Sequence, residues 1–423
     1  MAETTLPTPP APRPGGTGPA PADPVPPLAV RPRRADLAGA SHTPLVAVLL
    51  ALSAGLALYT GFSHPNIWSV TLQTVSFQDG FRRRFLVGTL LRPFAEASGY
   101  DYWTYATFSF LVLAVLVGVL ITAALRVRDS SRRFLVAAWF LLPTGGFLFH
   151  EVGYFDQVLY LMLFAAMGLL AKGRWIWAAA LMPWAALVHE ITALTVLPLF
   201  CAAAVRRLPV HKALMAVAPT ALLGGAVLLG KPMEEGAIER VKAALKGANF
   251  TPRPDVYSIF ERTMAENYGF YKPVEIFFFL LPLAILAVTT FALLHVVGGD
   301  RTLKSAGEGP CPRWLFVGAV ASAAASPLLI AFGGWDLYRW VFLLMANFCV
   351  ALWIWLGDRY DRNGQQDLTT RQFRTVVVAL LVSTHVPILY MDGKHPQPMT
   401  GPAMKGSYDW YTVWDGFDHP PKK

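Results

Sequence analysis

Charged residues are scarce in this sequence: lysine, arginine, aspartate and glutamate together make up only 15% of its 423 residues. A soluble protein of this length would carry about a quarter. Hydrophobic residues make up 54%, and they recur in apolar stretches of about 17 to 24 residues, each long enough to cross a hydrocarbon core of roughly 30 Å. The composition therefore excludes an ordinary soluble domain and predicts lipid as the solvent for most of the fold.

Cysteine and the common enzyme signatures are also missing or rare. The three cysteines do not form a disulfide framework. The sequence contains no complete G-x-x-x-x-G-K-[ST], no glycine-rich dinucleotide fingerprint opening a helix, and no G-x-S-x-G. These absences argue against a nucleotide-driven pump, a dinucleotide-dependent enzyme and a serine hydrolase.

The fold class that we predict is an all-α, multi-spanning membrane protein, because helices satisfy backbone polar groups where no water is available. We expect about eleven transmembrane helices, between ten and twelve, within residues 43–391. The expected spans are 43–62, 104–125, 134–149, 157–171, two short passes within 175–205, 213–230, 273–297, 314–332, 341–357 and 375–391.

The stretch 175–205 decides the topology. It has basic residues on both flanks and is interrupted by His189 and Glu190. If both flanks are cytoplasmic, the stretch crosses twice, or enters and returns, with its turning point near these two residues. A single long, tilted helix is the alternative, and it would invert every later loop.

The remaining segments follow the positive-inside rule. Short loops rich in arginine and lysine fall on the cytoplasmic side, together with a Pro/Ala-rich tail over residues 1–42 that we expect to be disordered. The long loops 63–103 and 231–272 and the tail 392–423 fall outside. The net charge of +9 fits this bias and contact with anionic lipids. We therefore expect a bacterial plasma (inner) membrane location, with membrane lipids and no nucleic acid as partners.

The loop 63–103 holds an unusual concentration of charge for an outer face. Its apolar residues predict amphipathic helices lying on the membrane surface, and Asp79 stands beside Arg82, Arg83 and Arg84. Guanidinium groups bind phosphate oxygens through paired hydrogen bonds, and a carboxylate near the interface can take the proton of an acceptor hydroxyl. The alternative is a surface helix whose arginines contact lipid headgroups, with Asp79 as its N-cap.

Ionisable residues also interrupt later apolar stretches. His150, Glu151 and Asp156 stand at the outer end of the third span, where they either orient a sugar hydroxyl, hold a metal or form a plain turn. His189 and Glu190 lie inside an apolar stretch, which indicates a hydrogen-bonding or proton-relay role in a cavity. Adjacent side chains do not share a helix face, so this pair predicts a helix break or two separate partners.

Asp336 and Arg339 form a further charged pair near the outer end of a predicted span. Three residues apart, they can pair with each other on one helical turn. A structural ion pair is one interpretation, and an anionic-substrate contact by Arg339 is the other.

This layout resembles the GT-C superfamily of integral membrane glycosyltransferases. The match rests on the long first outer loop with Asp79, followed by Glu151 and Asp156 at the exit of the third span. The resemblance implies a polyprenyl-phosphate-linked sugar as donor and a glycan or lipid as acceptor. It also implies that Asp79 is the catalytic base and that Arg82–Arg84 hold the donor phosphate.

The same resemblance assigns the sugar site to residues of later segments. His189, Glu190, Asp336 and Arg339 would shape it. No cofactor is required by this assignment. A divalent cation held by Glu151, Asp156 or Glu190 is the alternative.

Glycosyl transfer on the extracytoplasmic face, in cell-envelope glycan or glycolipid assembly, is therefore the function that we predict. One alternative is a polysaccharide or O-antigen-type polymerase. Another is a proton-coupled transporter or lipid flippase that uses His189, Glu190 and Asp336 as a relay across broken helices. Most ionisable residues cluster at one face and no internal repeat is evident, and both observations favour surface chemistry over transport.

Overall fold

The chain's computed structural model describes most of the predicted spans. The described residues are 43–61, 65–81, 83–127, 130–141, 147–150, 152–230, 233, 235–262, 284, 288, 309–331, 337–357, 373–375 and 377–378. In these ranges every regular element is a helix and no strand occurs, which confirms the all-α class there. The tails 1–42 and 392–423 lie outside the described residues, as do nearly all of the spans predicted at 273–297 and 375–391.

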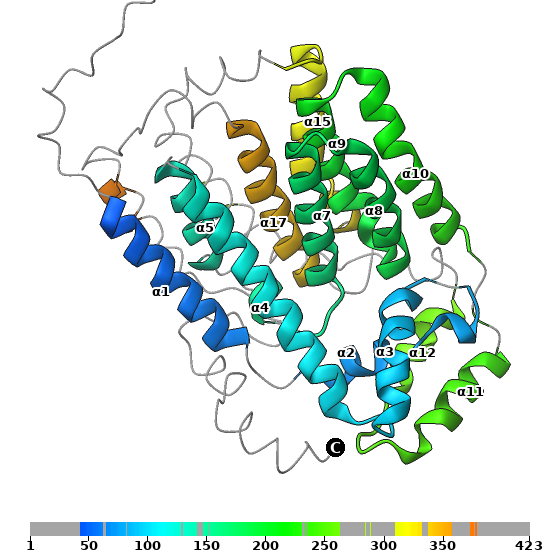
Figure 1. The fold of residues 1–423 in the computed structure, drawn as a ribbon. Coiled ribbons are helices and arrows are strands. Elements are labelled where there is room, and N and C mark those ends of the chain that lie inside the picture. Colours follow the sequence, from blue (N-terminus) through cyan, green and yellow to red (C-terminus); the bar gives the residue numbers. More distant parts are fainter. Residues whose placement is uncertain are drawn as a thin grey trace, which may run out of the picture. The chain divides into compact units, whose positions relative to one another are not determined.

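Long apolar helices make up the body of the fold and run side by side (Figure 1). They are α1 (Thr43–Gly61), α4 (Tyr102–Arg126), α5 (Ser130–Leu141), α7 (Asp156–Ala171), α8 (Trp175–Val188), α9 (Val196–Arg207), α10 (Val210–Leu228), α15 (Arg313–Ala325) and α17 (Leu337–Leu356). Shorter pieces between them are α6 (Phe147–His150), η4 (Glu190–Leu194) and α16 (Leu328–Ala331). Their facing sides bury one continuous apolar core.

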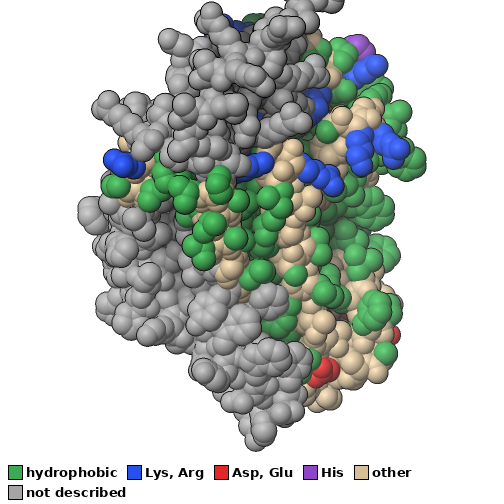
Figure 2. All heavy atoms as spheres, turned by 60° about the vertical axis from the view of Figure 1, so that its left-hand side comes forward, with side chains coloured by type: hydrophobic (Ala, Val, Ile, Leu, Met, Phe, Trp, Pro, Cys, Tyr) green, Lys and Arg blue, Asp and Glu red, His purple; other side chains and the backbone are tan. Residues whose placement is uncertain are grey.

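Two of the described helices, α4 and α10, are long and apolar enough to cross a membrane. Others, including α7, α8 and α15, are apolar but shorter. Large apolar side chains point outward from several of them, among them Leu222 on α10 and Trp177 on α8. Figure 2 shows hydrophobic side chains over much of the described surface, with lysines and arginines gathered in the upper part of the view. The count of about eleven spans stays a prediction.

Residues 175–205 form two helices and not one. His189 is extended, with φ −160° and ψ 135°, and therefore ends α8; η4 follows and α9 begins at Val196. The break expected at His189 and Glu190 is confirmed, and the single long helix is wrong. The 14 residues of α8 rise about 21 Å, which is less than a hydrocarbon core of roughly 30 Å.

The two predicted outer loops fold together into what we call the cap, at one end of the long helices (Figure 1). The first loop supplies α2 (Ile67–Leu72), η2 (Phe77–Asp79) and α3 (Phe85–Ala97), and the second supplies α11 (Glu235–Ala244), η5 (Leu245–Gly247) and α12 (Pro254–Glu261). The backbone N–H of Arg253 donates to Thr71 Oγ1 at 3.0 Å, and that of Tyr102 donates to Asn249 Oδ1 at 2.8 Å.

The helix α3 is amphipathic, as predicted for this loop. Its inner side buries Phe85, Val87 and Leu91, while Leu90 and Phe94 are exposed. Phe85 packs with Leu187 and Val227, near the ends of α8 and α10. That α3 lies on a membrane surface stays a prediction.

Gly88 on α3 permits a very close backbone approach, and its replacement tests that packing. A Cβ at this position would stand 1.9 Å from the Val75 carbonyl oxygen. Because backbone cannot swing aside as a side chain can, Gly88→Ala is expected to lower the free energy of unfolding by about 1–3 kcal/mol. Gly118 on α4 has open space around it, so Gly118→Ala is the matched control. Thermal unfolding of the full chain checks both, and equal melting temperatures would contradict the close approach.

Candidate functional site

Five of the predicted site residues meet in one buried group, which we call the ionic cluster. They are Arg84, Asp156, His189, Glu190 and Arg339, and none is more than 8% exposed. They come from the starts of α3, α7 and α17 and from the break between α8 and α9. The cluster therefore lies where the cap meets the long helices.

Arg84 and Glu190 form the half of the cluster nearest the cap. Arg84 Nε lies 2.9 Å from both Glu190 carboxylate oxygens, and Arg84 Nη2 also donates to Oε1. The backbone of Arg84 is left-handed, with φ 64° and ψ 16°, immediately before α3 begins. Such a conformation is uncommon for a residue other than glycine and costs of order 1 kcal/mol. The paired hydrogen bonds to Glu190 are the contacts that hold it.

Arg339 and Asp156 form the other half. Arg339 Nε and Nη2 donate to Asp156 Oδ2 at 2.9 and 2.5 Å. The guanidinium carbon also lies 5.1 Å from the centre of the Tyr154 ring and 5.3 Å from that of Trp340. The structure thus shows an ion pair between Arg339 and a partner 183 residues away. Asp336, the neighbour considered from the sequence, lies outside the described residues.

His189 joins the two halves. Its Nε2 lies 3.1 Å from Arg339 Nη2, and its Nδ1 lies 3.0 Å from Glu190 Oε2. A guanidinium can only donate, so Nε2 accepts and Nδ1 carries the proton that it donates to Glu190. The backbone N–H of Ile191 also approaches Nδ1, at 3.3 Å, which is longer than the 3.0 Å contact between Nδ1 and Glu190 Oε2. The two partners expected for this His-Glu pair are therefore Arg339 and Arg84.

Asp79 lies outside the ionic cluster, in the η2 turn. Its Oδ2 accepts from the Ser76 backbone N–H at 2.9 Å and from Ser76 Oγ at 2.8 Å, and it lies 3.8 Å from Arg92 Nη1. Ser76 is the N-cap of this turn and Asp79 its third residue. The alternative of Asp79 as the N-cap itself is therefore wrong, although its carboxylate does close the turn.

Arg83 points toward the second loop of the cap. Its Nη2 donates to the Arg262 backbone carbonyl at 2.7 Å and also to that of Ile259. Burial lowers the pKa of this guanidinium, and the charge of Glu190 opposes that shift. The triplet predicted as a phosphate clamp is thus divided, because Arg83 holds the second loop while Arg84 enters the ionic cluster. Arg82 lies outside the described residues.

The remaining predicted residues bear on the metal alternative. His150 ends α6 without a described side chain, and Glu151 lies outside the described residues. Within the part of the chain that the structure describes, no group of three or more His, Cys, Asp or Glu side chains could hold a metal ion. Asp156 and Glu190 are each bonded to an arginine instead.

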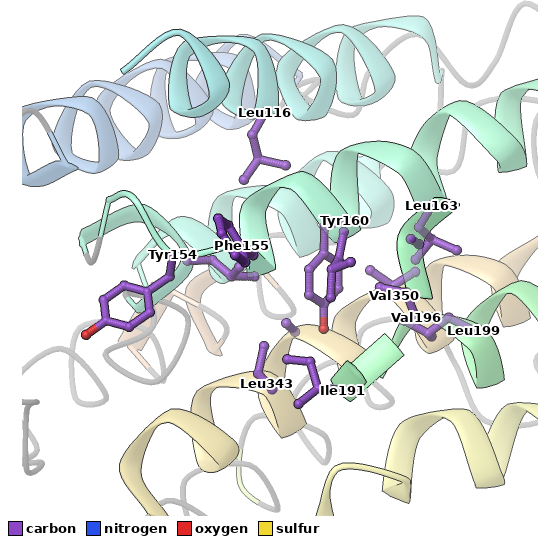
Figure 3. Packing of buried hydrophobic residues seen from close by; sticks show 14 of the residues in the cluster. Leu116, Tyr154, Phe155, Tyr160, Leu163, Ile191, Val196, Leu199, Leu343 and Val350 are labelled. Carbon is purple, nitrogen blue, oxygen red and sulfur yellow. The ribbon is translucent and has the colours of Figure 1, made fainter. Parts of the chain in front are cut away.

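A second polar group lies deeper between the helices and was not predicted. Asn347 Nδ2 donates to the backbone carbonyls of Thr195 at 3.0 Å and Ala323 at 2.8 Å, and Tyr160 donates to Asn347 Oδ1 at 2.5 Å. Figure 3 shows the Tyr160 hydroxyl pointing from α7 toward Leu343 and Ile191. A single asparagine inside an apolar run was the available signal.

Comparison of this chain with protein-family models, with curated proteins and with solved structures finds no match. The functional argument therefore rests on the residues themselves.

Proposed function

We propose that this protein is a multi-spanning membrane glycosyltransferase. It moves a sugar from a polyprenyl-phosphate-linked donor to an acceptor on the extracytoplasmic face, in cell-envelope glycan or glycolipid assembly. The observation that carries the proposal is the ionic cluster, which brings two arginines, two carboxylates and a histidine from four distant segments to the junction of cap and helices.

The cluster can receive an anion through Arg84. Glu190 occupies Nε and Nη2 of this guanidinium, and among the described residues no acceptor meets Nη1. Glu190 therefore fixes the plane of Arg84 and leaves one edge for phosphate oxygens. With Arg83 included, the described residues supply three guanidiniums and two carboxylates here. The larger number of guanidiniums favours binding of an anionic ligand.

The position of the cluster suits a lipid phosphate. The short α8 ends at His189 after about 21 Å, so a helix that begins at the inner face of a hydrocarbon core of roughly 30 Å leaves the cluster about 9 Å below the outer face. The exposed apolar side chains of α8 and α10, among them Trp177 and Leu222, can face lipid. A donor bound here keeps its polyprenyl chain in lipid and its phosphate beside Arg84.

Asp79 supplies the base in this proposal. Its Oδ2 closes the η2 turn, while Oδ1 takes part in no hydrogen bond of the described residues. The acceptor hydroxyl gives its proton to Asp79, and its oxygen bonds to the anomeric carbon of the donor sugar. The bond between that carbon and the phosphate oxygen breaks, and polyprenyl phosphate leaves with its charge stabilised by Arg84.

Asp79→Asn tests the base. The asparagine carbonyl oxygen keeps the capping acceptor for Ser76, so the fold is expected to be unchanged while transfer is lost. Surface glycans and lipid-linked sugars are compared in a deletion strain, in the same strain carrying the intact gene, and in one carrying the variant at matched membrane expression. The intact gene should restore the missing glycan and the variant should not.

Two results would count against the proposal, each at a different step. If Asp79→Asn restores the glycan fully, Asp79 is not the base, and the ionic cluster alone remains as the proposed site. A deletion strain with unchanged glycans and lipid-linked sugars would remove glycosyl transfer itself.

A further inference from the structure

Two buried polar atoms beside Arg339 have no hydrogen-bond partner within the part of the chain that the structure describes. Asp156 is 1% exposed and uses only Oδ2 for Arg339, so Oδ1 is left without a donor. Trp340 is 7% exposed, and its indole Nε1 is left without an acceptor. A buried polar atom without a partner costs about 1–3 kcal/mol, so both atoms call for a ligand group or an ordered water.

The chemistry of the two atoms restricts what can satisfy them. One is an acceptor and the other a donor, and both belong to groups packed against the same guanidinium. A phosphate would satisfy the indole and be repelled by the carboxylate. A cation would satisfy the carboxylate, but it would be repelled by Arg339 and could not use the indole N–H. A neutral hydroxyl can donate to Asp156 and accept from Trp340.

The surroundings suit a sugar and not an isolated hydroxyl. Tyr154 also lies against the Arg339 guanidinium, and Trp68 stacks on Tyr154 with ring centres 5.4 Å apart. Trp68 is half-buried, so this row of rings runs from Arg339 toward the surface. Sugar-sized ligands are commonly held by aromatic walls with a few placed polar groups.

We propose that Asp156 Oδ1 and Trp340 Nε1 form a subsite for a sugar hydroxyl. The inference rests on the proposed function and deepens it: the donor phosphate lies at Arg84, on one side of His189, and the sugar extends toward Asp156 and Trp340, on the other. Both residues are binding residues in this arrangement, and the base remains Asp79.

Binding of two kinds of lipid, one with and one without a sugar, by the full chain in nanodiscs tests the subsite. The probes are undecaprenyl phosphate and a panel of undecaprenyl-phosphate monosaccharides carrying glucose, galactose, mannose or arabinose. Trp340→Phe removes the indole N–H and keeps a ring. It is expected to weaken binding of the accepted sugar lipid by about three- to tenfold, the effect of one lost hydrogen bond. Binding of undecaprenyl phosphate without sugar should be unchanged.

Trp139→Phe is the matched control. Trp139 also has a buried indole N–H without a partner among the described residues, and it is 3% exposed and packed against the rings of Phe149 and Tyr160. It should bind both lipids as the intact protein does. Equal losses in both variants, or a Trp340→Phe loss for the lipid without sugar as well, would overturn the subsite.

A second measurement follows ligand binding in the intact chain. In the intact chain labelled with ¹⁵N-tryptophan, the indole signal of Trp340 is assigned by its absence in Trp340→Phe. A sugar lipid or a free monosaccharide of the same panel should shift this signal and leave that of Trp139 in place. If no probe moves it, the two atoms hold only water and the subsite is overturned. If sugars shift the Trp340 signal but the protein transfers no sugar, the subsite is supported and the proposed transferase activity is contradicted.

Discussion

Replacement of Arg84 by glutamine is expected to lower kcat/KM for sugar transfer by about 100-fold or more. In the proposed function Arg84 binds the phosphate whose negative charge grows as the donor bond breaks, and losing one such contact typically costs two to three orders of magnitude in rate. The assay follows sugar transfer from undecaprenyl-phosphate monosaccharides by the full chain in nanodiscs. Arg253→Gln is the control, because Arg253 is an exposed residue of the cap that pairs with Asp255. It should retain full activity.

A loss of activity in Arg84→Gln could also arise from damage to the fold. Removing the guanidinium leaves the charged Glu190 without its cation at 3% exposure, which typically costs about 3–5 kcal/mol of stability. The double variant Arg84→Gln with Glu190→Gln removes both charges and should regain most of that stability. Its transfer rate should stay low. Transfer by the stable double variant at close to the intact rate would show that Arg84 serves the fold and not the donor.

Local features of the fold were predictable because their signals lie within a few residues. Apolar runs predicted α4 at 104–125, where the structure gives Tyr102–Arg126. His189 and Glu190 predicted a break, because a charged pair inside an apolar stretch cannot remain in a lipid-facing helix. The Ser76-x-x-Asp79 spacing of a capping box is a local signal as well, although the residue expected as the N-cap was Asp79 and the structure gives Ser76.

The pairing of the site residues was not predictable in the same way. Glu190 meets an arginine 106 residues away, and Asp156 meets one 183 residues away. From the sequence, the partner considered for Arg339 was Asp336, three positions away, and Arg83 and Arg84 were equivalent members of one triplet. The fold separates that triplet because Arg84 takes a left-handed backbone, which turns consecutive side chains toward different partners. Neither the composition nor the periodicity of the sequence indicates which distant residue each of these side chains meets.

The opposite half of the ionic cluster predicts an equally large change in stability. Arg339→Met leaves the Asp156 carboxylate at 1% exposure without its cation, and the free energy of unfolding is expected to fall by about 3–5 kcal/mol. Methionine keeps much of the arginine stem, so its packing against Tyr154 and Trp340 is largely retained. Thermal unfolding of the full chain in nanodiscs measures the change.

The double variant Asp156→Leu with Arg339→Met separates stability from function. A buried ion pair replaced by apolar side chains of similar size is often neutral or stabilising, so this variant should melt close to the intact protein. It lacks the carboxylate that we assign to the sugar hydroxyl, so its binding of undecaprenyl-phosphate monosaccharides should fall to the level of undecaprenyl phosphate alone. If the single variant melts as the intact protein does, Arg339 and Asp156 are not a buried pair. An ion pair that contributes only to stability can be replaced without any effect on ligand choice. If the double variant is stable and still distinguishes the sugar lipids from undecaprenyl phosphate, the pair therefore serves only the fold.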